Sequence, residues 1–129
     1  MSRALIDTHA FVWWTGEPKR LSALAHDFLV NPKNKPVLSF ASIWEMQIKL
    51  SLGKLRLKTS LPELVEDEIS RNGLSLLPIE LIHIYALSDL SPHHRDPFDR
   101  LLIAQSTSEE PPVIGIDEKF DAYGIQRLW

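Results

Sequence analysis

Residues 4–14 read ALIDTHAFVWW, and this stretch decides the fold. Its apolar start, Ala4-Leu5-Ile6, predicts a short buried strand that ends at Asp7. From Thr8 to Trp14 the apolar residues recur at helical spacing, so a helix follows the strand directly. A strand that passes straight into a helix is typical of α/β proteins with parallel sheets.

The same alternation continues along the 129 residues. Apolar runs bounded by Gly, Pro or polar residues predict further strands, and apolar residues spaced by three and four predict helices. We expect an α/β fold of three layers, with a central, mainly parallel sheet of about five strands flanked by helices, and a single domain over residues 1–129. The further strands are expected over residues 36–39, 74–77, 113–116 and 125–128, and the further helices over 21–31, 42–52, 61–71, 79–87 and 96–105.

The composition is that of an ordinary globular protein, with 44% hydrophobic and 24% charged residues. The net charge of −3 argues against binding of nucleic acid by bulk positive charge. The chain has no Cys, which excludes disulfides and thiolate metal sites. The apolar segment before Asp7 is too short for a signal peptide, and no run reaches membrane-spanning length, so we expect a cytoplasmic protein.

Acidic residues lie where predicted strands end and where predicted helices begin. Asp7 and Asp117 follow apolar strands, and Glu45 and Asp99 stand near helix starts that face the same edge of the sheet. Carboxylates about 4 Å apart repel each other by on the order of 4 kcal/mol at an effective dielectric of ~20. Such a cluster needs a proton, a cationic side chain or a metal, and all-oxygen ligands suit Mg²⁺ or Mn²⁺.

Each of these acids also has a purely local interpretation. Asp7 fits the N-cap of the next helix. Ser42-Ile43-Trp44-Glu45 fits a capping box, and Glu45 stands four residues before Lys49, the spacing of a helical ion pair. Asp96-Pro97-Phe98-Asp99 fits a helix start, with Asp96 as the cap and Asp99 in the first turn. Asp117 fits an ordinary turn.

Taken together, four blocks of sequence resemble the PIN-domain family, specifically the VapC-type toxins of bacterial toxin–antitoxin pairs. They cover nearly the whole chain in the family's order, and each places an acid at a strand end or a helix start. The blocks are residues 5–14 (LIDTHAFVWW), residues 39–49 (SFASIWEMQIK) continuing to Gly53-Lys54-Leu55, residues 94–105 (HRDPFDRLLIAQ), and Asp117 with Phe120 and Tyr123.

The resemblance implies a cleft lined by acids and a metal-dependent endoribonuclease, blocked by a cognate antitoxin and assembled as a homodimer. It implies that Asp7, Glu45 and Asp99 are catalytic and bind Mg²⁺ or Mn²⁺, with Asp117 as a fourth and more variable member. Relatives commonly carry Thr or Ser two residues before this last acid, where this chain has Gly115. Asp96 and Asp121 are expected to be structural, as a helix cap and on a solvated turn.

Other polar residues near these blocks are candidates for contact with RNA or for ordering the site. The candidates for substrate contact are Arg95, Arg100, Lys49 and Thr8. The basic run Lys49, Lys54, Arg56 and Lys58 fits either phosphate steering or a solvated helix end. We expect His94 to order its loop, and His9 to point away from a metal or to donate a hydrogen bond near it.

The chain has four Trp residues, and core packing explains only one or two of them. Because aromatic residues are enriched at interface hot spots, we expect at least one of Trp13, Trp14 and Trp44 to touch a partner.

Three other functions are weighed against the nuclease. A haloacid-dehalogenase-like phosphatase would use Asp7 but needs a second Asp two residues later, where this chain has His9. A receiver-type phosphoacceptor domain needs paired acids before the phosphoacceptor, and the first strand supplies only Asp7. A catalytically inactive PIN-like binding module would keep the fold without the chemistry, but all four acids are present.

Overall fold

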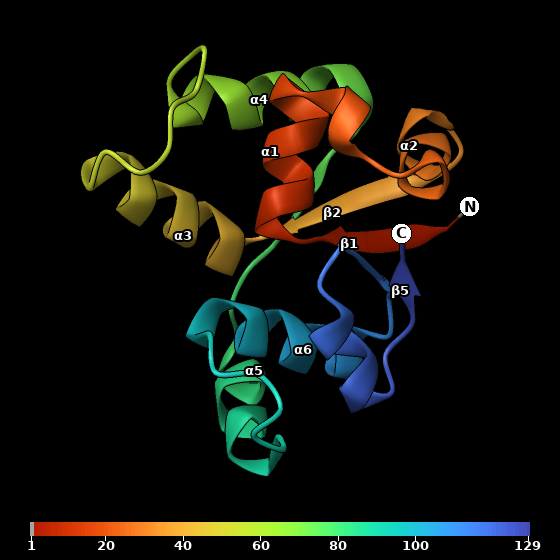
Figure 1. The fold of residues 1–129 in the computed structure, drawn as a ribbon, viewed down its shortest axis with the longest axis vertical. Coiled ribbons are helices and arrows are strands. Elements are labelled where there is room, and N and C mark those ends of the chain that lie inside the picture. The colour runs from red at the N-terminus through yellow and green to blue at the C-terminus, as the bar shows by residue number, and fades with distance from the viewer. Residues whose placement is uncertain (1) are drawn as a thin grey trace.

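The computed structural model describes residues 2–129. The five strands form a parallel sheet in the order β3-β2-β1-β4-β5. The sheet crosses the middle of the molecule (Figure 1). This confirms the expected α/β fold, and every strand pair is parallel. The strands are β1 (Arg3–Ile6), β2 (Lys35–Ser39), β3 (Ser75–Leu77), β4 (Val113–Ile114) and β5 (Arg127–Leu128).

Helices cover both faces of this sheet. The α-helices are α1 (Thr8–Gly16), α2 (Ala23–Val30), α3 (Phe40–Ser51), α4 (Leu61–Asn72), α5 (Leu81–Ala86) and α6 (Pro97–Glu109). Three short 3-10 helices complete the described chain: η1 (Pro18–Arg20), η2 (Leu87–Asp89) and η3 (Glu118–Tyr123). Figure 1 shows α1, α2 and α4 on one side of the sheet and α5 and α6 on the other, so the three expected layers are present.

The alternation of side chains along β1 builds a separate core on each face of the sheet. Ala4 and Ile6 pack with Phe11 of α1 in one buried cluster. Leu5 points the other way and packs with Leu102 of α6 in a second cluster. Because both faces of β1 are covered, its residues from Ala4 onward are fully buried, as is usual for the central strand of a parallel sheet.

Several element boundaries differ from those predicted. The helix α3 begins at Phe40 rather than Ser42, and α6 continues past Gln105 to Glu109. The strand predicted over residues 113–116 ends at Ile114, and the strand predicted over 125–128 is reduced to Arg127–Leu128. No helix among residues 2–129 has the length and apolarity that a bilayer crossing requires.

Candidate functional site

Asp7 is fixed by the backbone of two strands and by the helix that follows it. Its N–H donates to the carbonyl of Ile114 at 3.0 Å, which ties the end of β1 to β4. One carboxylate oxygen, Oδ1, caps α1 by accepting the N–H of Ala10 at 2.7 Å. The residue is only 3% exposed. Asp7 is therefore a helix cap, as its local interpretation predicted, and a buried carboxylate at the carboxyl edge of the sheet.

Gly115 lies against this carboxylate. A Cβ atom built at position 115 would come within 2.5 Å of Asp7 Oδ2 and 3.0 Å of Asp7 Cγ. At these distances a side chain at position 115 requires either residue 115 or the Asp7 carboxylate to move. Position 115, where the resemblance implies Thr or Ser in the family, is thus one where the Asp7 carboxylate occupies the space of a side chain.

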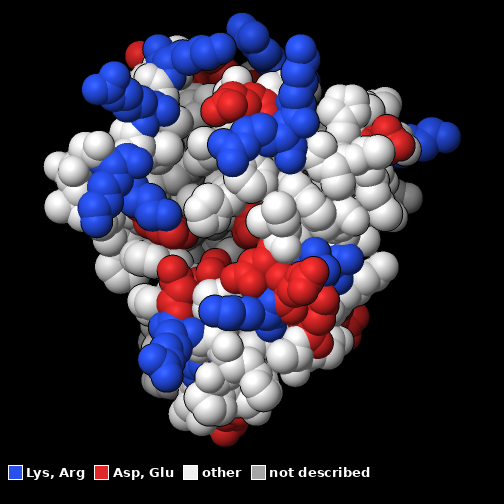
Figure 2. All heavy atoms as spheres, viewed as in Figure 1, with Lys and Arg blue, Asp and Glu red and all other residues white. Residues whose placement is uncertain are grey.

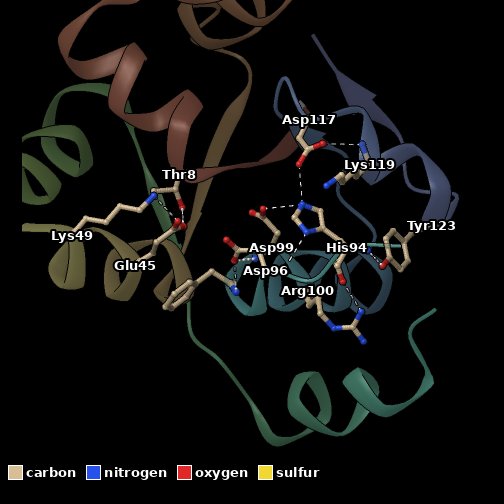
Figure 3. Close-up of polar contacts among 11 residues, drawn as sticks. Thr8, Glu45, Lys49, His94, Asp96, Asp99, Arg100, Asp117, Lys119 and Tyr123 are labelled. Carbon is tan, nitrogen blue, oxygen red and sulfur yellow. Dashed lines mark hydrogen bonds and ion pairs between the residues drawn. The ribbon is translucent and has the colours of Figure 1, made fainter. Parts of the chain in front are cut away.

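Glu45 reaches the same region from α3, and its exposed fraction is 6%. Its Oε1 accepts a hydrogen bond from the Thr8 hydroxyl at 2.6 Å, and its Oε2 lies 2.9 Å from Lys49 Nζ (Figure 3). The predicted ion pair with Lys49 is confirmed. The predicted capping box is wrong, because Ser39 caps α3 by accepting the N–H of Ala41, and the Ser42 hydroxyl is buried with no partner among residues 2–129.

Asp99 enters from the first turn of α6. Asp96 caps this helix, as predicted, by accepting the N–H groups of Phe98 and Asp99 at 2.8 and 3.2 Å. Pro97 occupies the start of the helix, where no N–H is needed. The cap fixes the direction in which α6 begins, and so it directs Asp99 towards the other acids (Figure 3).

Asp117 follows β4 after the two residues Gly115 and Ile116, and it caps η3. Its Oδ1 accepts the N–H of Lys119 at 2.9 Å, and its Oδ2 lies 2.8 Å from His94 Nε2. Since both oxygens already have a hydrogen-bond partner, Asp117 is held more firmly by the protein than Asp99 is.

His94 lies between the acids of α6 and η3. Its Nε2 is 2.8 Å from Asp117 Oδ2 and 3.0 Å from Asp99 Oδ2 (Figure 3). Sequence reasoning gave this residue only a role in ordering its loop. Its position two residues before the cap of α6, within a block that resembles the PIN family, was the signal that could have placed it at the site.

The buried acids raise one another's affinity for protons. Burial is the main cause that raises the pKa of Asp7 to about 7, and the charges of Asp99, Glu45 and Asp117 add to it against the opposing effect of the Ala10 N–H. Burial also raises the pKa of Asp99 to about 7, with Asp96, Glu45 and Asp117 adding to it and His94 opposing it. These mutual effects place the predicted acids of the site in one cluster.

The pKa of Asp117 is shifted in the opposite direction from those of Asp7 and Asp99. Burial acts to raise its pKa, but the Lys119 N–H and the His94 ring outweigh burial and lower it below the usual value. The cluster therefore contains two carboxyl groups that resist ionisation and one that is ionised readily. A bound cation would relieve the repulsion at Asp7 and Asp99.

Several of the candidates for substrate contact form hydrogen bonds or ion pairs within the protein. The Arg100 guanidinium donates to the carbonyls of Leu87, Leu90, Ser91 and His94, at 3.0 to 3.4 Å. It therefore holds the loop before α6, and within the described part of the chain it forms no ion pair with an acid. Lys49 is committed to Glu45, Thr8 donates to Glu45, and Arg95 is exposed.

The remaining aromatic and charged residues near these blocks have simple positions. His9 is exposed and lies beside Trp13, and Trp14 packs edge-on against Phe11. Trp44 is 55% exposed on α3. Asp121 is exposed in η3 and pairs with Arg127 at 2.9 Å, in accord with its predicted structural role.

The open oxygens of the cluster belong to Asp7 and Asp99. Among residues 2–129, no donor hydrogen-bonds to Asp7 Oδ2 or to Asp99 Oδ1, whereas both oxygens of Glu45 and of Asp117 have partners. The donor set consists of oxygens that carry negative charge, and it fits a hard divalent cation such as Mg²⁺ or Mn²⁺.

The fold and this site define an α/β domain with a cluster of acids at the carboxyl edge of a parallel sheet. The chain belongs to the PIN domain family, which matches residues 4–126. PIN domains are generally nucleases.

Solved structures of similar fold support this assignment. VapBC2 from Rickettsia felis, bound to a DNA fragment from its promoter, has a chain with a TM-score of 0.72 and 13% identity, covering 98% of this chain and 99% of its own. FitAcB from Neisseria gonorrhoeae gives 0.63 and 15%, with 96% and 95% covered. FitAB bound to an IR36 DNA fragment gives 0.63 and 16%, with 96% and 92% covered. A search of curated proteins gave no significant match.

Proposed function

We propose that this protein is a metal-dependent endoribonuclease that acts as the toxin of a toxin–antitoxin pair. The observation that carries the proposal is the cluster of Asp7, Glu45, Asp99 and Asp117 in a PIN domain, where burial, with repulsion between the acids adding to it, raises the pKa of two members to about 7. Such a cluster costs stability unless a cation compensates the repulsion.

The four acids have different roles in this proposal. Asp7 and Asp99 hold the metal directly, because each has a carboxylate oxygen that accepts no hydrogen bond from residues 2–129. Glu45 binds the metal or a metal-bound water through the carboxylate lone pairs that its bonds to Thr8 and Lys49 leave free. It also orients the attacking water. Asp117 acts through water or at a second, looser site. When bound, the Mg²⁺ or Mn²⁺ ion makes a water nucleophilic and stabilises charge on the phosphate.

RNA is the proposed substrate, and the charges on the surface are compatible with it. Figure 2 shows Asp and Glu side chains gathered around a hollow, with Lys and Arg side chains on the surface around them. The exposed cations Arg95, Lys54, Arg56 and Lys58 are available to bind phosphates of RNA. Lys49 and Arg100 are better assigned to holding Glu45 and the loop before α6.

The proposed partners are a cognate antitoxin and a second copy of this chain, in the cytoplasm. The structural neighbours are toxins of VapBC and FitAB toxin–antitoxin systems. Trp44 is the Trp best placed for a partner, since it is one residue before Glu45 and remains largely exposed beside Phe98. An antitoxin that covers Trp44 would also cover the acids.

The test is RNA cleavage by the purified chain with Mg²⁺ or Mn²⁺, and again with EDTA. Asp7→Asn should abolish cleavage with little loss of folding, because Asn keeps the cap oxygen for the Ala10 N–H and removes the charge. Asp27→Asn is the matched control, since that carboxylate is 82% exposed and far from the other acids in sequence. Full cleavage by Asp7→Asn, or cleavage that EDTA leaves unchanged, would refute the mechanism.

A further inference from the structure

His94 is a buried polar residue that the proposed roles of the four acids do not use. It is 6% exposed and is held at both ends of its backbone. Its N–H donates to the Tyr123 hydroxyl at 2.8 Å, and its carbonyl accepts from Arg100 Nη1 at 3.0 Å. Its ring lies beside Phe120, with centroids 5.9 Å apart. The ring position is therefore set by the protein before any ligand binds.

The position of this ring is compatible with metal ligation. The ligand atoms of His94, Asp99 and Asp117 all lie within 4.8 Å of one another, close enough to share one ion. A histidine can ligate a metal only through a ring nitrogen that carries a lone pair and no hydrogen. The question is thus which of its two ring nitrogens carries the hydrogen.

The contact made by the other ring nitrogen, Nδ1, identifies which nitrogen carries the hydrogen. His94 Nδ1 accepts the backbone N–H of Asp96 at 3.2 Å. An amide N–H can be accepted only by a nitrogen with a lone pair, so the hydrogen of the ring is on Nε2. Metal-ligating histidines have the opposite arrangement, in which the second nitrogen donates its N–H to an acceptor. Here the second nitrogen faces a donor, and Nε2 faces two carboxylates.

We propose that His94 is a positioning residue for the metal site and not a metal ligand: its Nε2–H fixes Asp117 Oδ2 and lies against Asp99 Oδ2, so that Asp99 turns its other oxygen, Oδ1, towards the cation. The inference rests on the proposed function, because it concerns the same acids. The backbone N–H of Asp96 selects the donor form of the ring, and this same residue caps α6. One residue thus orients both Asp99 and the group that holds Asp99 in place.

The first test uses the wild-type protein. Long-range ¹H–¹⁵N spectra of the metal-free, ¹⁵N-labelled chain should show His94 as the tautomer with hydrogen on Nε2, and added Mg²⁺ should leave this tautomer unchanged. With Mn²⁺ bound, pulsed electron paramagnetic resonance should show no coupling from a coordinated imidazole nitrogen. The Nδ1–H tautomer, or the coupling of a coordinated nitrogen, would overturn the proposal.

The second test measures Mn²⁺ affinity in variants. His94→Leu should weaken binding by about tenfold to a hundredfold, the usual effect of removing an outer-shell partner of a metal ligand. His94→Gln should recover most of this loss, since its amide can donate from near the position of Nε2. His93→Gln is the control, because His93 is exposed beside Tyr123 and should leave affinity within about twofold of wild type.

These outcomes separate the two proposals. If the wild-type chain binds no Mn²⁺, the proposed function and the role of His94 fail together. If the chain binds Mn²⁺ and cleaves RNA but His94 shows nitrogen coordination, or if His94→Leu binds Mn²⁺ as well as wild type, only the role of His94 fails.

Discussion

Gly115→Ala is the substitution that tests the geometry of the site most directly. The new Cβ would stand 2.5 Å from Asp7 Oδ2, whereas carbon–oxygen contacts are normally about 3.3 Å or longer. Either residue 115 or the carboxylate must therefore move by roughly 0.8 Å, the difference between these two distances. The backbone of residue 115 is held on both sides, since its N–H donates to Leu128 at 3.3 Å and its carbonyl accepts from Arg127 at 3.2 Å. Most of the movement falls on Asp7.

Moving Asp7 has two measurable consequences. Its Oδ1 caps α1 through the N–H of Ala10, and weakening a cap costs about 1 kcal/mol of the free energy of unfolding. Its Oδ2 is an open oxygen of the proposed metal site, and a misplacement of about 1 Å can reduce activity by as much as roughly a hundredfold. We expect Gly115→Ala to bind Mn²⁺ at least about tenfold more weakly and to lose most of its RNA cleavage.

The assay is a calorimetric Mn²⁺ titration of the variant, with urea unfolding of the same sample. Gly16→Ala is the matched control, because a Cβ there meets no atom within 4 Å, and we expect it to leave metal affinity unchanged. A Gly115→Ala protein with wild-type Mn²⁺ affinity and wild-type stability would refute the reasoning. Ser or Thr at position 115 adds the same Cβ, so the hydroxyl that relatives commonly carry there cannot enter this chain without displacing Asp7.

Two further predictions concern charge and the loop before α6. The pKa values of Asp7 and Asp99 are raised to about 7, above the usual 3.8, so the folded chain keeps these protons to a higher pH than the unfolded chain does. The free energy of unfolding of the metal-free protein should therefore fall as the pH rises from about 4 to about 7, by about 1.4 kcal/mol per pKa unit for each of the two groups. Urea titrations at about pH 5 and about pH 8 should show that Mg²⁺ stabilises the chain more at the higher pH, and an equal effect at both would contradict this origin of the pKa shifts. Arg100→Lys should lower the free energy of unfolding by about 2 kcal/mol, because an ammonium group cannot bridge four carbonyls, whereas Arg95→Lys, at an exposed position, should leave it unchanged in the same urea assay.

The sequence predicted the architecture because the features that determine it are local. Ala4-Leu5-Ile6 is apolar on both faces, which only a central strand covered on both sides can use. Asp7 ends this strand and caps the next helix, and Asp96-Pro97 marks the start of α6 in the same direct way. Both signals depend on residues within a few positions of each other, so no knowledge of the tertiary structure is needed.

The start of α3 shows where local signals mislead. Ser42 and Glu45 have the spacing of a capping box, but Ser39 is already the cap, and Ser42 lies one turn inside the helix with its hydroxyl buried. The spacing alone cannot tell which of two serines ends the strand. Tertiary contacts decide it, since Glu45 is drawn to Thr8 and Lys49 instead of to its own helix start.

The contacts of His94 and Arg100 could not be predicted, for a different reason. Their partners lie many residues away in sequence or are backbone carbonyls, which carry no signature in the amino-acid sequence. A His in a polar loop and an Arg near the start of a helix both suggest contact with solvent or with substrate. In the folded chain both side chains face inward, and they stabilise the loop and the acids beside it.

The pairing of β1 with β4 has a consequence for how such proteins diverge. Leu5 lies opposite Val113 and Ile6 opposite Ile114, so the two strands that lead to Asp7 and Asp117 are aligned by main-chain hydrogen bonds. Peptide groups form this ladder whatever side chains they carry, provided that the strands remain apolar enough to stay buried. Substitutions at most other positions can therefore leave the spacing of these two acids intact. This is consistent with the architecture that this chain shares with solved structures only 13% to 16% identical to it.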